Sequence, residues 1–318
     1  MALFFYRMTL SVHKPALVKE VTTGLNLKSG DAVIDATVGG GGHALVILEA
    51  TAPNGKLLGL DWDRAAIERA GQRLQPYKNR IVLKTGNYRD IKKLAYESEF
   101  YQVNAILLDL GFSTDQIKDS QRGFSFQTDA PLDMRFSDQG ALTAGAIVNT
   151  WSENELAHIF RIYGEERHAA RIAHTIVASR QRAPINSVLE LVALVLRGAG
   201  NRGRGKIHPA TRIFQALRLA TNSELENLTA VLPDLLDLLA PGGRLAVISW
   251  HSLEDRIVKN FFRAQSRACI CPPELPVCAC DHEPRLRIVN KKVIAPGPAE
   301  VKQNPSARSA KLRLAEKL

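Results

Sequence analysis

Three carboxylates close apolar stretches in the first third of the chain, and a run of four glycines lies just after the first of them. Asp35, Asp61 and Asp109 end the stretches "AVID", "LLGLD" and "AILLD". The glycines belong to "VIDATVGGGGHALVI" (33–47) and are followed at once by His43. Glycines let the backbone approach a ligand closely, and carboxylates can bind its hydroxyl or amino groups. These residue types and spacings predict a cofactor site.

Two cofactor classes fit the glycine turn. Gly39, Gly41 and Ala44 match the dinucleotide pattern G-x-G-x-x-G/A. Asp61 lies 22 residues after Gly39, where a carboxylate meets ribose hydroxyls. S-adenosylmethionine (SAM) has no phosphate, so there the glycines make room for its methionine and adenosine parts. Asp35 would repel a pyrophosphate but suits the amino-acid end of SAM, unless it only caps a turn. The residues favour SAM and leave a nicotinamide-dependent enzyme open.

Polar or aromatic residues also follow the third and fourth apolar runs. Tyr88 lies in "YRD" (88–90), and "DLGFSTDQ" (109–116) begins with Asp109. Open α/β sheets bind their ligands outside the carboxyl ends of the strands. We therefore expect four strand ends to converge on one crevice.

Apolar runs alternate with helical patterns along this part of the chain, which indicates a parallel sheet covered by helices. The expected strands cover residues 32–36, 56–63, 81–87 and 105–111. A helical pattern over 66–74 separates two of them. The predicted fold class is α/β.

The pattern changes after Gly111. Residues 157–181 and 187–196 space their apolar side chains as helices do, and no strand pattern lies among them. A long helix is expected from about Pro209 to Leu239. It is followed by a "PGG" turn and a buried strand over residues 244–252.

A strand that rejoins a parallel sheet needs a crossover helix of this kind, so the last strand belongs with the first four. The helical stretch therefore interrupts one fold. We predict a discontinuous core of residues 9–114 and 208–318, with an inserted helical domain at 115–207.

The charge of the chain is positive and unevenly distributed. The 318 residues carry a formal net charge of +10, and 45% of them are hydrophobic, as in a globular protein. Residues 161–220 hold 11 Lys and Arg against 3 Asp and Glu, and residues 251–318 hold 13 against 7. Basic helices are often only solvated faces. Two separate basic blocks, with the loop "NRGRGK" (201–206), favour a nucleic-acid partner instead.

The N-terminal stretch and the cysteine positions suggest neither a membrane nor an oxidising compartment. The apolar run in "MALFFYRMTL" is too short for a signal-peptide core or a membrane span, so a cytoplasmic location is expected. All the cysteines are Cys269, Cys271, Cys278 and Cys280. They could form a structural zinc site with four thiolates, although C-x-C spacings are tighter than the usual pattern.

Several stretches, taken together and in order, closely resemble the bacterial 16S rRNA cytosine-N4 methyltransferase family. The resemblance covers nearly the whole chain. It is carried by "HKPALVKE" (13–20), "DATVGGGGHA" (35–44), "DLGFS" (109–113), "RGFSFQTDAPLDMRF" (122–136), "YGEERHAARIA" (163–173), "HPATRIFQALRLATNSEL" (208–225), "PGGRLAVISWHSLEDRIVK" (241–259) and "NPSARSAKLRLAEK" (304–317).

The resemblance implies a Rossmann-like class I SAM-dependent methyltransferase with an inserted helical domain. Its expected substrate is the exocyclic amine of a cytidine in the decoding region of 16S rRNA, within the small ribosomal subunit. The cofactor contacts that it implies are Asp35, Gly41, Gly42, His43, Asp61, Tyr88, Asp109 and Gln116, of which Gln116 rests on the resemblance alone.

The chain departs from the usual family pattern in small ways. Thr114 stands where a second serine is common, Phe136 where methionine is common, and Trp250 where phenylalanine is common. These exchanges affect fine geometry rather than activity. Residues 1–8 precede the usual start of the family, which favours Met8 as the initiator.

Methyl transfer to a cytosine amine needs acceptors that localise the nitrogen lone pair, and Asp109 and Ser113 are expected to supply them. Methylation of carbon 5 would instead need a cysteine at a strand end, where the sequence has none. His251 is either an acid, base or RNA contact, or a residue that caps a strand end. Phe112, Phe124 and Phe126 are candidates to stack on the flipped base, or else they belong to the core.

The basic blocks supply the expected rRNA contacts. These are Arg122, Arg202, Arg204, Lys206, Arg308, Lys311 and Arg313. The main alternative class is an RNA-binding assembly factor with a vestigial cofactor fold, which would gain nothing from three carboxylates at one crevice. A dehydrogenase is disfavoured because no other segment suggests a hydride-transfer site.

Overall fold

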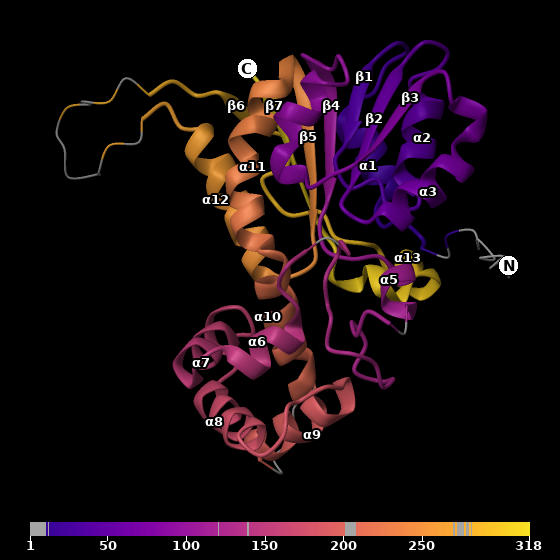
Figure 1. The fold of residues 1–318 in the computed structure, drawn as a ribbon. Coiled ribbons are helices and arrows are strands. Elements are labelled where there is room, and N and C mark those ends of the chain that lie inside the picture. Colours follow the sequence, from indigo (N-terminus) through magenta and orange to yellow (C-terminus); the bar gives the residue numbers. More distant parts are fainter. Residues whose placement is uncertain are drawn as a thin grey trace, which may run out of the picture. The chain divides into compact units, whose positions relative to one another are not determined.

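The chain folds into two compact units (Figure 1). The computed structural model describes residues 11, 13–119, 121–138, 140–200, 208–269, 271, 277, 280 and 282–318. The core unit runs to Gly111 and resumes at Leu225, and the inserted unit is Phe112–Glu224.

The core unit is built on one mixed sheet. Its strands are β1 (Ala32–Asp35), β2 (Lys56–Asp61), β3 (Ile81–Thr85), β4 (Val103–Asp109), β5 (Leu239–Ser249), β6 (Leu286–Ile288) and β7 (Lys311–Lys317). They lie in the order β3-β2-β1-β4-β5-β7-β6. The first five are parallel, while β7 pairs antiparallel with both β5 and β6. The order reverses at β1, so the first strand lies at the topological switch point where such sheets bind ligands.

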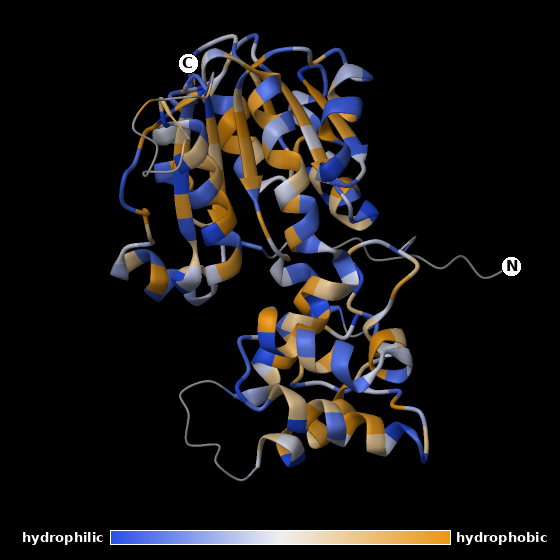
Figure 2. Ribbon diagram, turned by 90° about the vertical axis from the view of Figure 1, so that its left-hand side faces the viewer, coloured by the Kyte–Doolittle hydropathy of each residue, from blue (hydrophilic) through white to orange (hydrophobic). Residues whose placement is uncertain are grey.

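The strands alternate their side chains between two hydrophobic layers, as the two-residue period of a strand requires. Ile34 and Ile106 pack on one face of the sheet, and Val33 and Ala105 pack on the other. The first face is covered by α4 (Ile91–Tyr96), α11 (Glu224–Leu238) and α12 (Ser252–Gln265). The second is covered by α1 (Val18–Leu25), α2 (Gly42–Ala50) and α3 (Arg64–Arg73). Helix α13 (Pro298–Gln303) lies between β6 and β7 in the sequence. Figure 2 shows the strands as mostly hydrophobic, which is consistent with burial on both faces.

The inserted unit is helical and has a core of its own. Its helices are α5 (Thr114–Lys118), α6 (Ala144–Thr150), α7 (Glu153–Ile162), α8 (Ala169–Arg180), α9 (Val188–Ala199) and α10 (Pro209–Asn222). Phe160, Ile172, Leu191 and Leu217 are fully buried in one cluster. Polar N-caps set several helix starts: the hydroxyls of Ser152 and Ser187 accept the amides of α7 and α9 in capping boxes.

The α/β class and the inserted helical region agree with the sequence prediction, but both boundaries between the units differ from it. Residues 112–114 and 208–224, which include α10, were expected in the core, whereas the structure groups them with the inserted unit. The expected helix from Pro209 to Leu239 is two helices, because Ser223 adopts a left-handed conformation with φ 49° between α10 and α11. The apolar face of α10 packs against α7 and α9, and this packing decides the boundary.

Other expected bounds also shift for local reasons. The helical pattern over 157–181 is broken between α7 and α8, where Glu165 has φ 49° and Gly164 lies tightly against the backbone of Arg212. The "PGG" stretch is an irregular part of β5 rather than a turn before it. The strand then ends at Ser249, so residues 250–252 lead into α12 instead. Among the described residues, no helix combines the length and apolar character needed to cross a membrane.

Candidate active site

The three carboxylates predicted from the sequence meet at the carboxyl edge of the sheet. Asp35 ends β1, Asp61 ends β2 and Asp109 ends β4. Asp35 lies within electrostatic range of both of the others. The parallel direction of these strands brings their last residues to one edge, so three acids spread over 75 positions of sequence share one site.

Asp35 is the most buried of the three, with 1% of its surface exposed. Its Oδ1 accepts the amide of Thr37 at 3.2 Å, while its Oδ2 has no hydrogen-bond partner among the described residues. Burial raises the pKa of the Asp35 carboxyl to about 7, and the neighbouring His43 opposes that shift. The site therefore holds a carboxyl that is poised to ionise near neutral pH.

Asp61 fixes the glycine turn. Its Oδ2 accepts the amide of Gly39 at 2.9 Å, and its Oδ1 accepts the amide of Asp63 at 2.8 Å. Burial raises the pKa of Asp61 to about 6, although both backbone hydrogen bonds favour the ionised form. The carboxylate thus joins the end of β2 to the turn that follows β1.

The glycines of the turn are required for different reasons. Gly41 has φ 79° as the N-cap of α2, and a Cβ there would lie 3.2 Å from Leu74. A Cβ on Gly42 would lie 2.9 Å from the ring of Pro15. Gly39 also has positive φ, but only a backbone oxygen lies within 4.0 Å of its missing side chain. Gly41 and Gly42 therefore serve packing, and Gly39 presents the open side of the turn.

Asp109 is held from three directions. Its backbone amide donates to the Thr37 hydroxyl at 2.7 Å, and its Oδ1 accepts the Trp250 indole N–H at 3.0 Å. Its Oδ2 lies 3.6 Å from Nε2 of His43, which is buried without a hydrogen-bond partner in the described part of the chain. The carboxylate is therefore fixed in orientation, with one oxygen turned towards an imidazole.

The sequence prediction missed Thr37 and Trp250 as contributors to this site. Thr37 follows β1 by two residues and Trp250 follows β5 directly, and each hydrogen-bonds to Asp109. The position of Thr37 after an apolar run was an available signal, whereas Trp250 lay inside the strand expected over residues 244–252. Tyr88, which was predicted, begins a short 3₁₀ helix (Tyr88–Asp90) after β3. Its side chain is partly buried and packs against the hydrophobic cluster that contains Ile34 and Ile106.

Ser113 and Gln116 belong to the inserted unit. The Ser113 hydroxyl accepts the amide of Gln116 at 3.2 Å, and the Gln116 side chain accepts the amide of Ser113 at 2.9 Å. This capping box starts α5. In the structure both residues have a local folding role, and their predicted roles towards substrate and cofactor stay predictions.

His251 caps a helix. It is the N-cap of α12, where its Nδ1 accepts the amide of Glu254 at 3.5 Å, and its Nε2 lies 3.1 Å from the Glu254 carboxylate. The side chain is 11% exposed. His251 thus caps a helix rather than a strand end, and its predicted chemical role stays a prediction.

The predicted RNA contacts are placed very differently from one another. Arg313 donates to both carboxylate oxygens of Asp255, at 2.7 and 3.1 Å, and is 13% exposed. Arg122 donates to the Phe136 carbonyl at 2.9 Å and to Asp119 at 3.2 Å. Arg308 is exposed, and Lys311 is half-buried at the start of β7. Arg202, Arg204 and Lys206 lie outside the described residues.

The basic block of the inserted unit also stabilises that unit. Arg180 donates to the carbonyls of Val148 and Trp151, at the end of α6. Arg171 does the same at the end of α9, where it donates to Gly198 and Ala199. Cations favourably meet the unpaired carbonyls of helix C-termini. Charge counting alone therefore overstates how many arginines are available to a partner.

The aromatic residues considered for base stacking are engaged with one another or with other side chains of the inserted unit. Phe112 and Phe124 stack with centroids 5.4 Å apart, and the Arg218 guanidinium lies 4.5 Å from the centroid of Phe112. Phe126 stacks on His208 at 5.2 Å. Phe124 is buried in the core of this unit, as the alternative interpretation expected, while Phe112 and Phe126 are partly exposed.

Comparisons with known proteins identify relatives along nearly the whole chain. The model of the MraW methylase family matches residues 10–318. Proteins named "Ribosomal RNA small subunit methyltransferase H" are similar to this chain in sequence. The one from Thermomicrobium roseum is 52% identical and covers 97% of this chain and 94% of its own. The one from Geobacter sulfurreducens is 49% identical and covers 98% and 100%.

Similarity to solved structures is weaker. An rRNA methylase from Streptococcus thermophilus superposes with a TM-score of 0.39 and 12% identity, over 95% of this chain and 93% of that chain. This similarity is too low to add to the sequence relationships.

Proposed function

Because the chain belongs to the MraW methylase family, we propose that it is a SAM-dependent methyltransferase of small-subunit ribosomal RNA whose target atom is N4 of a cytidine in the decoding region. The observation that carries the proposal is the convergence of Asp35, Asp61 and Asp109 around a glycine turn. The proposal places the enzyme in the cytoplasm, with the small subunit as its partner.

The residues at this edge suit SAM. The buried, unpartnered Oδ2 of Asp35 is matched to a cationic group, since an opposite charge would stabilise its ionised form. Asp61, at the end of the second strand, is placed for ribose hydroxyls, and Gly39 leaves the turn open. When bound, SAM supplies an electrophilic methyl group on a sulfonium. Three acids at one edge are a poor match to a pyrophosphate, which disfavours a dinucleotide.

Asp109 is the group that we assign to the target amine. The amine of cytosine is a poor nucleophile because its lone pair is delocalised into the ring. A fixed carboxylate can accept a hydrogen bond from that amine, localise the lone pair, and orient the nitrogen for in-line attack. Trp250 and Thr37 hold Asp109 in place for this role, while His43 lies beside its second oxygen.

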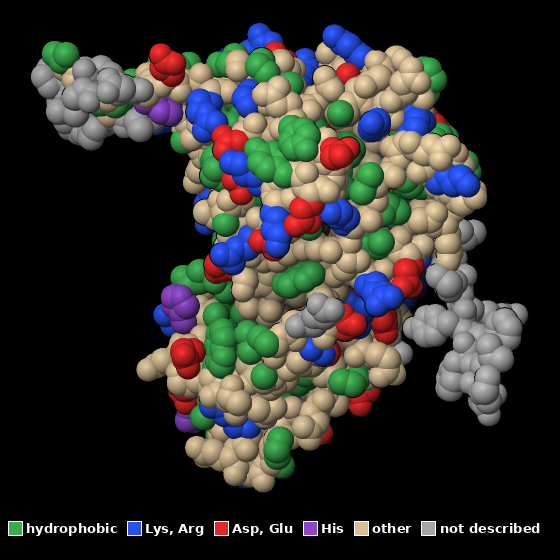
Figure 3. Space-filling model, turned by 45° about the horizontal axis from the view of Figure 1, so that its top comes forward, with side chains coloured by type: hydrophobic (Ala, Val, Ile, Leu, Met, Phe, Trp, Pro, Cys, Tyr) green, Lys and Arg blue, Asp and Glu red, His purple; other side chains and the backbone are tan. Residues whose placement is uncertain are grey.

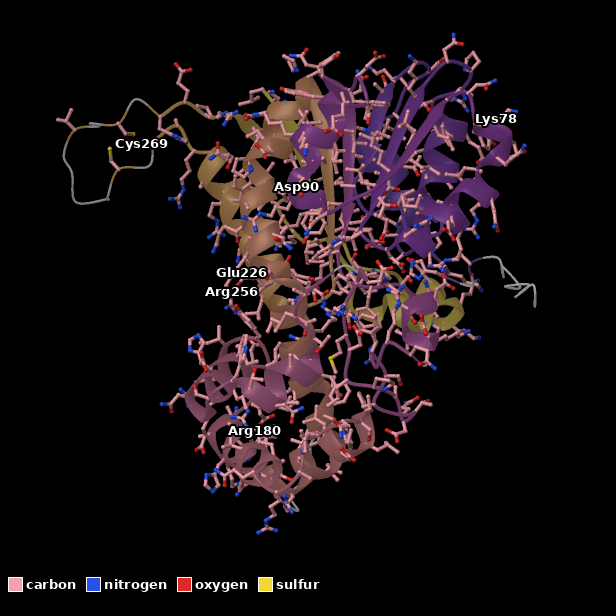
Figure 4. The ribbon with its side chains drawn as sticks, viewed as in Figure 1. Lys78, Asp90, Arg180, Glu226, Arg256 and Cys269 are labelled. Carbon is pink, nitrogen blue, oxygen red and sulfur yellow. The ribbon has the colours of Figure 1, made fainter. Side chains whose placement is uncertain are left out.

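Methylation of carbon 5 of the cytosine ring, instead of N4, is disfavoured by where the cysteine thiols lie. That chemistry needs a cysteine nucleophile. All cysteines of the chain lie between residues 269 and 280, and Figure 4 shows Cys269 on an arm beyond the end of α12. No cysteine ends a strand of the sheet.

RNA phosphates are proposed to contact arginines that the fold leaves exposed. Among the described residues of the inserted unit these include Arg161, Arg167, Arg182 and Arg197. On the face drawn in Figure 3, Lys and Arg lie among Asp and Glu rather than in one continuous patch. We therefore expect several separated phosphate contacts instead of one basic groove.

The product decides the proposal. Purified protein is incubated with labelled SAM and unmethylated small subunits, the RNA is digested, and the labelled nucleoside is identified. We expect N4-methylcytidine at one site in the decoding region. Label in 5-methylcytidine, in adenosine or in protein would refute the proposed target atom.

Variants at the edge test the role of Asp109. We expect Asp109→Ala to lower kcat by about 10²- to 10⁴-fold, as for loss of a positioned acceptor, while SAM binding is retained. Trp250→Phe is the matched control, since it introduces the residue that is common in the family and removes only one hydrogen bond to Asp109. It should lower kcat by about tenfold or less. Equal losses in both variants would contradict the assigned role.

A further inference from the structure

Three of the four cysteines converge on the arm between α12 and β6, away from any strand end. The Sγ atoms of Cys269, Cys271 and Cys280 all lie within 4.8 Å of one another. Cys278 lies outside the described residues, and in the sequence it stands between two of the converging thiols. No part of the methyl-transfer site uses this cluster.

The spacing of the sulfurs matches one tetrahedral ion. Cys269 Sγ and Cys280 Sγ are 3.7 Å apart. Two thiolates bound to Zn²⁺ at about 2.3 Å in tetrahedral geometry lie about 3.8 Å apart. A disulfide would require about 2.05 Å. Ligands of a multi-iron cluster are distributed over several metals, so three sulfurs this close favour a single ion.

The arm is built to bring these thiols together. The amide of Cys271 donates to Cys269 Sγ at 3.4 Å, an arrangement that stabilises negative charge on the sulfur. At the base of the arm, the amide of Arg285 donates to the Gln265 carbonyl at 2.8 Å. His282 Nε2 lies 3.2 Å from the carbonyl of Ala264. These contacts fix the two ends of the arm, so residues 11 positions apart in sequence face each other.

We propose that Cys269, Cys271 and Cys280 bind one Zn²⁺ as thiolates, with a structural role on the arm. Soft sulfur ligands select Zn²⁺ over the hard cations of the cell, and three thiolates leave one position of a tetrahedral site for a further ligand. The ion links the two sides of the arm between α12 and β6, and it takes no part in methyl transfer.

The experiment measures metal and thiol reactivity in the full-length protein. Because all cysteines of the chain lie between residues 269 and 280, every thiol that reacts with a disulfide reagent comes from this segment. We expect about one zinc per chain by elemental analysis, slow reaction of the thiols, and fast reaction after a chelator is added. Co²⁺ in place of zinc should show sulfur-to-metal charge-transfer absorption.

Variants separate a ligand role from a general effect on the arm. Cys280→Ser should weaken zinc binding by more than the 10- to 100-fold that is typical of losing a group that only orients a ligand. Val277→Ser is the matched control, since Val277 is exposed on the same arm and carries no ligand atom, and it should keep its zinc. Far-UV circular dichroism checks that both variants are folded.

The opposite results would overturn the proposal. These are a protein that takes up no zinc when titrated with it, thiols whose reaction is unchanged by the chelator, or a disulfide between two of the cysteines in protein purified from a reducing cytoplasm. Methyltransferase activity is not the readout, so failure here leaves the proposed reaction untouched.

Discussion

At the scale of single residues, the buried Asp35 carboxyl is costly to the fold and useful to a cationic ligand. Its environment of two other acids and little solvent disfavours charge, while His43 and the Thr37 amide oppose that effect. Functional sites commonly keep such groups because the ligand supplies the missing partner. Two measurable pH effects follow from the raised pKa.

We expect Asp35→Asn to stabilise the ligand-free protein, and more so at high pH. The pKa of Asp35 is about 7 in the folded protein against 3.8 as its ordinary value, so the folded state holds its proton more tightly. Stability contributed by the protonated form is lost as pH rises from about 4 to about 7 and is then constant. Removing the charge should therefore gain up to a few kcal/mol at pH 8 and less at pH 5. Urea unfolding at both pH values measures this.

Asp61→Asn is the matched control for that measurement. Both oxygens of Asp61 accept backbone amides, from Gly39 and Asp63, and an asparagine can accept with only one of its two terminal atoms. We expect this variant to gain less stability than Asp35→Asn, because the pKa of Asp61 is raised only to about 6 and the loss of an accepted amide offsets the gain. An equal gain for Asp35→Asn at pH 5 and pH 8 would show that its charge is not the cause.

We also expect SAM to bind more weakly as pH falls below 7. A cationic ligand prefers the ionised form of Asp35, whose pKa is about 7, and of Asp61, whose pKa is about 6. Affinity should rise with pH by at most about tenfold per pH unit for each proton released, and it should become constant above a pH of about 7. Calorimetry across this range tests it. Asp35→Asn should flatten the dependence in part, and an affinity that is the same at pH 5.5 and 7.5 would contradict the expectation.

The sequence predicted much of this site because its acids end apolar runs. It could not show that Thr37 and Trp250 orient Asp109, since these contacts join β1, β4 and β5 across the sheet. It also suggested that Arg313 faces RNA. The structure pairs Arg313 with Asp255, 58 residues away in the chain, and no local pattern reveals such a partner.

At the scale of elements, the turn between β1 and α2 depends on glycine for conformation and for space. Gly41→Ala should destabilise the protein by about 1–2 kcal/mol, because an alanine at φ 79° is strained. It should also weaken SAM binding, because the new Cβ lies 3.2 Å from Leu74 and displaces the turn.

Gly30→Ala separates these two effects. Gly30 has φ 87° with no atom within 4 Å of a built Cβ, so its variant has the backbone strain alone. Thermal unfolding should show similar losses in both variants, whereas calorimetry should show weaker SAM binding only in Gly41→Ala. Unchanged SAM binding in Gly41→Ala would mean that the turn does not shape the cofactor site.

Two arginines on and just after α8 allow a test of which charges serve the fold. Arg180 donates to carbonyls at the end of α6, so Arg180→Gln should destabilise the protein by about 1–2 kcal/mol. Arg182 is exposed, so Arg182→Gln should leave the free energy of unfolding unchanged. It should reduce the slope of log RNA affinity against log salt concentration by about one, as expected for the loss of one phosphate contact. Unfolding and salt-dependent RNA titrations compare the two. The reverse assignment would contradict the structure.

Elements buried on both faces were the easiest to predict, and the later ones were harder. Strands β1 to β4 stand out as apolar runs, whereas "KLRLAEK" was interpreted as part of a basic tail. Leu312 and Leu314 alternate with charged residues there and are buried in β7. This two-residue period was present in the sequence, but the pairing of β7 between β5 and β6 is long-range and left no local mark.

At the scale of the whole molecule, the two units separate cofactor binding from most of the exposed arginines proposed for RNA. Replacing residues 112–224 by a flexible Gly/Ser linker should keep SAM binding within about tenfold, because the acids and the glycine turn lie in the core unit. RNA methylation should be lost. Calorimetry and the labelled-subunit assay measure the two activities. Complete loss of SAM binding in a folded core would show that Gln116 or its neighbours are essential to the cofactor site.

The insertion also has a consequence for how the protein is made. Strand β4 ends at Asp109, but its partner β5 ends at Ser249, so about 140 residues must leave the ribosome before the two can pair. At 5–20 residues per second this takes roughly 7 to 28 s, during which one edge of β4 has no neighbouring strand. The helical unit emerges in that interval with a hydrophobic core of its own. The first four strands are therefore synthesised before the inserted helices, and β5 can pair with β4 only after those helices have been made.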